Sequence, residues 1–98
     1  MNSLSDIKAK LDGFDQAISS NQCNTTLLIQ RAILRKRTYQ FSTATADLNK
    51  AILCGGSDMA EALFQRGLIY RYHLNKIDLA MEDFNNAIQV LFTNIITR

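Results

Sequence analysis

The sequence predicts an all-α protein built as a stack of antiparallel helix pairs, and three observations lead to this fold class. The chain has 98 residues, of which 47% are hydrophobic and none is proline, and Leu, Ala and Ile are its commonest residues. That is a composition typical of unbroken helices. Clusters of Ser, Asn and Gly divide the chain at intervals. One phrase also recurs three times, as LDGFDQAI, TADLNKAI and EDFNNAI.

Turn signals set the bounds of about five expected helices. The stretches SSNQCN (19–24) and CGGSD (54–58) are the clearest breaks, because Ser, Asn and Gly suit helix ends. Shorter breaks fall at 39–42 and 73–78. The helices are therefore expected at about 4–19, 25–38, 43–54, 58–73 and 78–92.

The three copies of the phrase are in register over whole helices. Phe14, Leu48 and Phe84 are equivalent, with separations of 34 and 36 residues. The second and fourth helices match at a separation of 35, so that Arg31 corresponds to Arg66. Self-similarity at this period indicates stacked units, each of which buries its apolar face on the next. We expect one domain, with a half repeat at 5–20, full repeats at 24–56 and 58–92, and a tail at 93–98.

The segments LFQRGLIY and LAMEDFNNAI, taken together, resemble a tetratricopeptide repeat, and LLIQRAILR with ATADLNKAI resembles it less fully. The resemblance implies a right-handed superhelical stack that serves as a non-catalytic protein-interaction module with a concave groove. It also assigns positions that hold the repeat together. These are Ala32, Ala44, Leu48, Ala51, Gly67, Tyr70, Ala80, Phe84 and Ala87.

Small residues are expected where the paired helices cross. Ala32 facing Ala44, and Gly67 facing Ala80, would let the helix axes approach to the close end of the usual range. A glycine in mid-helix costs about 1 kcal/mol relative to alanine. We expect close contact at Gly67 to offset that cost.

Two arginines are candidates for structural ion pairs. Arg31 and Arg66 are equivalent, and each is followed in the next helix by a carboxylate, Asp47 or Asp83. A pair within each repeat is the favoured interpretation. Phosphate contact and a solvated charge are the alternatives.

The second and fourth helices carry a third apolar stripe beyond those that two packing seams need. In the family that the chain resembles, this stripe would face the groove. The expected groove residues are Ile29, Ile33, Lys36, Arg37, Phe64, Leu68, Arg71 and Tyr72. An apolar or amphipathic protein segment would fit them. The alternative is that the apolar members only seal neighbouring helices together.

Other functions find little support in the sequence. The only histidine, His73, lies in an expected turn, no phosphate-binding loop is present, and no metal or cofactor is expected. Cys23 and Cys54 lack metal-ligand spacing, so reduced thiols in a cytoplasmic protein are expected. No apolar run approaches the length of a membrane span.

Two alternatives to the peptide-binding function stay open. The first is self-association as part of a larger assembly, including a homodimer through the apolar C-terminal end. Val90, Leu91, Phe92, Ile95 and Ile96 crowd that end. The second is nucleic-acid binding through the basic helix at 31–37, although a net charge of +2 gives it little support.

Overall fold

A computed structural model describes residues 3–97, and in that range all regular secondary structure is helical, as expected from the sequence. The helices number five: α1 (Leu4–Ser20), α2 (Thr25–Arg37), α3 (Phe41–Cys54), α4 (Met59–Tyr72) and α5 (Ile77–Ile96). None of them is long and apolar enough to cross a membrane.

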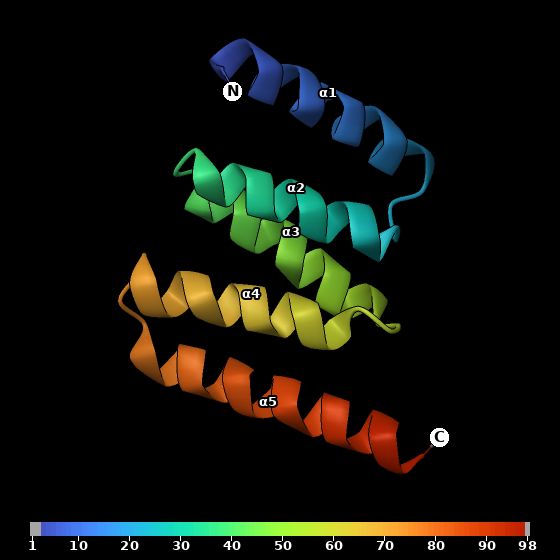
Figure 1. The fold of residues 1–98 in the computed structure, drawn as a ribbon, viewed down its shortest axis with the longest axis vertical. Helices are drawn as coiled ribbons and strands as arrows, with labels where there is room; N and C mark the ends of the chain where they lie inside the picture. The colour runs from blue at the N-terminus through green and yellow to red at the C-terminus, as the bar shows by residue number, and fades with distance from the viewer. Residues whose placement is uncertain (1–2, 98) are drawn as a thin grey trace.

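The helices follow one another in sequence order along the longest axis of the molecule (Figure 1). Each runs antiparallel to its neighbours in the chain. Helices α2 and α3 form one pair, and α4 and α5 form the other. Helix α4 contacts both helices of the first pair, whereas α1 packs on α2. The second pair therefore rests on the first through α4.

Side-chain caps and left-handed residues define several helix ends. Ser3 and Asp6 form a reciprocal capping box at the start of α1, and Asn24 accepts a hydrogen bond from the Leu27 amide at the start of α2. The loop inside each pair contains one left-handed residue, Tyr39 (φ 62°) in the first pair and Asn75 (φ 53°) in the second. The two loops differ in length, with three residues between α2 and α3 and four between α4 and α5.

Helix α5 is longer than expected, and its repeat partner α3 shows why. Helix α3 stops at Gly55 and Gly56, whose φ angles of 72° and 93° are left-handed. The equivalent positions in α5 are Leu91 and Phe92, which continue the helix to Ile96. The end expected near residue 92, and a separate tail from residue 93, were therefore wrong.

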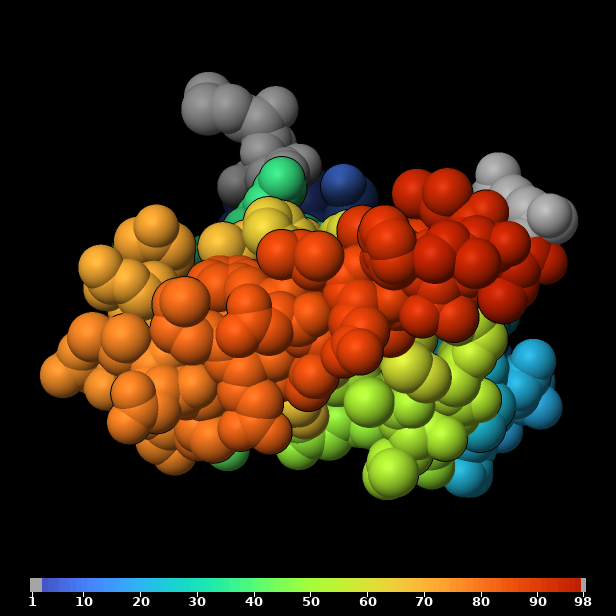
Figure 2. All heavy atoms as spheres, turned by 90° about the horizontal axis from the view of Figure 1, so that it is seen from below, coloured from blue at the N-terminus to red at the C-terminus, as the bar shows by residue number. Residues whose placement is uncertain are grey.

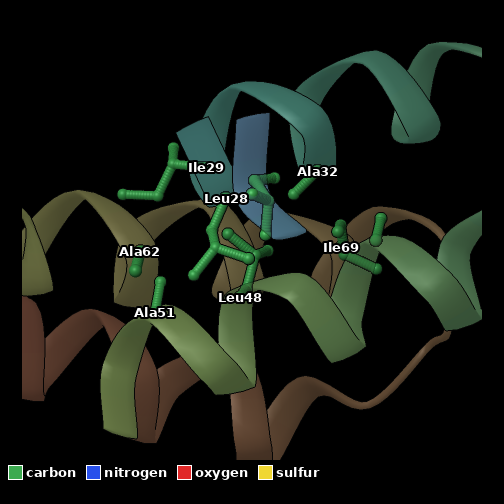
Figure 3. Close-up of a cluster of buried hydrophobic side chains, with 9 residues drawn as sticks. Leu28, Ile29, Ala32, Leu48, Ala51, Ala62 and Ile69 are labelled. Atoms are coloured by element: carbon green, nitrogen blue, oxygen red, sulfur yellow. The ribbon is translucent and has the colours of Figure 1, made fainter. Parts of the chain in front are cut away.

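The core lies between α2, α3 and α4 (Figure 3). Leu28, Leu48 and Ile69 are its largest fully buried side chains, one from each of these helices. Most of the positions assigned to holding the repeat together are buried. Buried among them are Ala32, Ala44, Leu48, Ala51, Gly67, Ala80 and Ala87, while Tyr70 and Phe84 are half-buried.

The crossing at Gly67 differs from the expected one in its partner. Ala80 is fully buried, but the three atoms nearest to the position of a Cβ on Gly67 all belong to the ring of Phe84. The glycine therefore makes room for an aromatic ring on the facing helix.

The sequence led us to expect two reduced cysteines, and this was wrong. Cys23 and Cys54 form a disulfide. Their Cα atoms are 5.6 Å apart, inside the usual range for a disulfide. The bond ties the loop before α2 to the last residue of α3. Disulfides persist in oxidising surroundings, so the bond removes the ground on which a cytoplasmic location was expected.

Candidate protein-interaction surface

Arg31 and Arg66 each pair with an aspartate of the following helix, which confirms the expected structural pairs. Arg31 donates from Nε and Nη2 to the two carboxylate oxygens of Asp47, at 3.0 and 2.6 Å. Arg66 does the same to Asp83, at 2.8 and 2.7 Å. Both pairs are bidentate, the geometry that gives an arginine–carboxylate bond its specificity.

Each arginine also reaches back to the helix that precedes it. Arg31 donates from Nη1 to Asp15 of α1 at 2.9 Å, and Arg66 donates from Nη1 to Asn49 of α3 at 2.8 Å. Each guanidinium thus connects three successive helices, and we call this arrangement a guanidinium node. The backward contact was not expected from the sequence. Asp15 and Asn49 do, however, have the same separation of 34 residues as the recurring phrase, and that signal could have found them.

The carboxylates of these nodes are almost entirely buried. The side chains of Asp47 and Asp83 are 5% and 4% exposed. Hydrogen bonding to Asp47 raises the pKa of Arg31, and hydrogen bonding to Asp83 raises that of Arg66, against the opposing effect of burial. Stability from the arginine charge is therefore fully present at neutral pH and is lost only as the pH rises through these elevated values.

The basic run at 31–37 is largely occupied by contacts within the chain. Arg35 joins Arg31 on Asp47, with 2.9 Å between its Nη1 and the carboxylate oxygen. Lys36 donates to the side-chain oxygen of Gln65 on α4 at 3.0 Å. Arg37 is exposed.

The remaining expected groove residues of α2 lie in two environments. Ile29 is only 5% exposed and belongs to the core, in line with the alternative that it seals neighbouring helices. Ile33 is half-buried, and with Arg37 it lines a shallow hollow between α1 and α2. In that hollow they face Lys10 and Phe14 of α1.

The expected groove residues of α4 are more open. Phe64 is 44% exposed, Leu68 is half-buried, and Arg71 and Tyr72 are exposed. The Arg71 guanidinium lies 5.3 Å from the centre of the Tyr72 ring, a cation–π distance. These residues give α4 a surface of apolar and cationic character.

Phe64 also lines a groove between the helices of the last pair, which we call the α4–α5 groove. It has a volume of about 510 Å³ and a mostly apolar lining. Its members include Ala60, Glu61, Phe64, Phe84, Ile88 and Leu91. Viewed from its end, the molecule presents α5 as its outer face, with no other helix over it (Figure 2).

Comparison with the first pair shows that side chains of the α4–α5 groove are more exposed than their equivalents. Phe64 is 44% exposed, whereas its equivalent in the first pair, Ile29, is 5% exposed. Ile88 is 64% exposed, whereas its equivalent Ile52 is half-buried. Helix α4 covers the first pair, and among residues 3–97 no helix does so for the second. The chain thus contains the same surface once covered and once open.

Within the described residues, no three side chains of the His, Cys, Asp and Glu types gather where they could hold a metal ion. His73 stacks on Phe41, with 4.2 Å between the ring centres, and so helps to join α3 to the end of α4. Its role in the structure is packing.

The chain was compared with known proteins in three ways. No family model matches it, and neither a curated protein nor a solved structure was found to be similar.

Proposed function

We propose that this chain is a non-catalytic protein-interaction module, built as a right-handed superhelical stack of helix pairs similar to tetratricopeptide repeats. The support for a repeated unit is the guanidinium node. Arg31 and Arg66, 35 residues apart, make the same contacts to the preceding and the following helix. A helical bundle without internal repeats is not expected to contain the same set of contacts twice.

The partner in this proposal is a protein segment, either a peptide or a helix, that covers the apolar side of α4. The single observation that carries the proposal is the exposure of Phe64 at a position where the first pair buries Ile29. Aromatic side chains that remain accessible beside an apolar groove are common anchors for partners. Leu68, Arg71 and Tyr72 continue this surface along α4.

Selection from a random peptide library displayed on phage, with the full chain as bait, tests the proposal. We expect enrichment of amphipathic sequences and loss of their binding to Phe64→Asp. A matched control is Leu53→Asp, because Leu53 is 86% exposed and is not a member of the groove. Circular dichroism of both variants checks that helicity is retained. No enrichment, or binding that ignores Phe64→Asp in a folded protein, would contradict the proposal.

Self-association is a second candidate function. It is favoured by the apolar end of α5, where Phe92, Ile95 and Ile96 are 61%, 71% and 64% exposed. Contiguous apolar surface of this kind marks interfaces. Nucleic-acid binding is less supported, because Arg31 and Arg35 are held on Asp47. A steep fall of nucleic-acid affinity with rising salt would be its signature.

A further inference from the structure

Helix α4 shows how a helix sits on the groove of the first pair. At its start, Asp58 accepts hydrogen bonds from the hydroxyls of Thr25 and Thr26, at 3.0 and 2.9 Å. Farther along, Gln65 accepts from Lys36 of α2, and Arg66 donates to Asn49 of α3. The apolar contacts come from Ala62 and Ile69, which are 0% and 1% exposed within the core.

The two helices that contact a preceding helix in this way share one pattern. In α4 it is Ala62, Arg66 and Ile69, an apolar residue followed four positions later by arginine and seven positions later by a second apolar residue. In α2 the same spacing is found in Leu27, Arg31 and Leu34. Positions separated by four and seven residues lie on one helical face, so the arginine lies between the two apolar contacts.

The acceptor for this arginine also recurs. Asp15 of α1 receives Arg31, and Asn49 of α3 receives Arg66. Continuing the register by 36 residues leads to Asn85 on α5. Asn85 is exposed, and it directly follows Phe84, which lines the open α4–α5 groove. Helix α5 therefore offers the third copy of an acceptor whose first two copies are occupied.

We propose that the α4–α5 groove takes an amphipathic helix of another protein that carries this pattern, apolar residue, arginine and apolar residue at spacings of four and three, with the arginine bonded to Asn85. The inference rests on the proposed function and adds the chemistry of the partner. The partner helix would pack on α4 and α5 in the way that α4 packs on α2 and α3.

The charges around the groove refine the partner further. Glu61 stands where the first pair has Thr26, so a basic residue or the N-terminus of the helix fits there, in place of the acidic Asp58 of α4. Arg71 stands where the first pair has Lys36, which binds Gln65. A Gln or Glu directly before the arginine of the partner would therefore bond to Arg71.

A peptide with the sequence of residues 58–74 of this chain, with Asp58 replaced by Lys and both ends blocked, is a defined probe. It would be titrated into the isotope-labelled full chain, at concentrations at which the chain sediments as a monomer. We expect amide shifts at Glu61, Asn85, Ile88 and Leu91 and none at Lys10 or Arg37, which lie beside the other hollow. A peptide with Arg66→Glu should bind at least about tenfold more weakly.

Position 85 supplies the decisive variants, because a side chain exposed there can change without damage to the core. Asn85→Asp should strengthen binding of the arginine peptide several-fold, since Asp15 is the residue at this position in the half repeat. Asn85→Lys should weaken binding of the arginine peptide and strengthen that of the Arg66→Glu peptide. Ile88→Asp should abolish both.

Binding that ignores position 85 and the peptide arginine would overturn the inference while leaving an interaction module in place. Absence of any binding by the probe, when library peptides do bind, would overturn it in the same way. If unlabelled chain reproduces the groove shifts without peptide, a second copy is the occupant and the inference is wrong. Failure of the library selection and of the probe together would reject the proposed function itself.

Discussion

The ring of Phe84 lies where a Cβ atom on Gly67 would be, with its Cε1 atom only 2.6 Å from that position. In the first pair the equivalent positions hold Ala32, which is larger than glycine, and Leu48, which is smaller than phenylalanine. The two crossings therefore fill the same space in two ways. Glycine with phenylalanine and alanine with leucine are alternative solutions of one packing problem.

Gly67→Ala should therefore be unfavourable although alanine is the better helix former. We expect overpacking of about 1–3 kcal/mol, offset by about 1 kcal/mol of helix propensity, for a net loss of about 1 kcal/mol in the free energy of unfolding. Urea denaturation would measure it. In the background of Phe84→Leu the same change should be neutral or stabilising. Equal effects in both backgrounds would show that the ring does not set the requirement for glycine.

Arg66 and Asp83 should be coupled energetically. Arg66→Ala leaves the nearly buried Asp83 carboxylate without its bidentate partner, which we expect to cost about 3–5 kcal/mol. A double-mutant cycle with Asp83→Ala should give a coupling energy of about 0.5–3 kcal/mol. Arg71→Ala serves as the control, because Arg71 is exposed and its loss should change stability by less than about 0.5 kcal/mol. Simple additivity of Arg66→Ala and Asp83→Ala would remove the structural role of the pair.

Reduction of the Cys23–Cys54 disulfide should lower stability. The bond closes a loop with a sequence separation of 31 residues. In the chain-entropy account this corresponds to about 3–4 kcal/mol. Unfolding of the wild-type chain in urea should therefore shift to lower denaturant when a reductant is added. The double variant Cys23→Ser, Cys54→Ser should match the reduced protein and should not respond to the reductant, and an unchanged midpoint in the wild type would contradict the prediction.

The exposed end of α5 should cause weak self-association at high protein concentration. Phe92, Ile95 and Ile96 form an exposed apolar surface. Association would remove this surface from water, which is favourable. Sedimentation at several concentrations should show a rise in average mass that Phe92→Asp abolishes. Leu53→Asp, at a position that is more exposed than Phe92 but lies on α3, should leave the association intact. A monomer at all concentrations would mean that this end needs no cover.

Sequence reasoning located the helices because their signals are local. Turn residues and a helical composition placed the ends of α1 and α2 within one residue. The expected starts and ends failed where local signals were weak, at the start of α3 and at the end of α5. Leu91 and Phe92 continue α5 because they lack the left-handed freedom of the glycines that end α3.

The repeat also determined the pairs of Arg31 with Asp47 and of Arg66 with Asp83, since a pattern copied along the chain must be satisfied in each copy. The disulfide does not follow from the repeat, but it can be found once the antiparallel hairpin of α2 and α3 is known. Cys23 lies sixteen residues before Tyr39 and Cys54 lies fifteen residues after it. A hairpin that turns at Tyr39 brings positions at equal distances from the turn side by side.

What the sequence by itself determined is the helices, their register and the arginine–aspartate pairs, because these depend on periodicity and on residues repeated at fixed spacing. Which apolar residues are covered was decided only by the tertiary structure. Ile29 and Phe64 occupy equivalent positions on similar helices, yet one is buried and the other is open. The physical reason is that burial depends on whether a further helix lies over the position, and α4 covers the first pair alone.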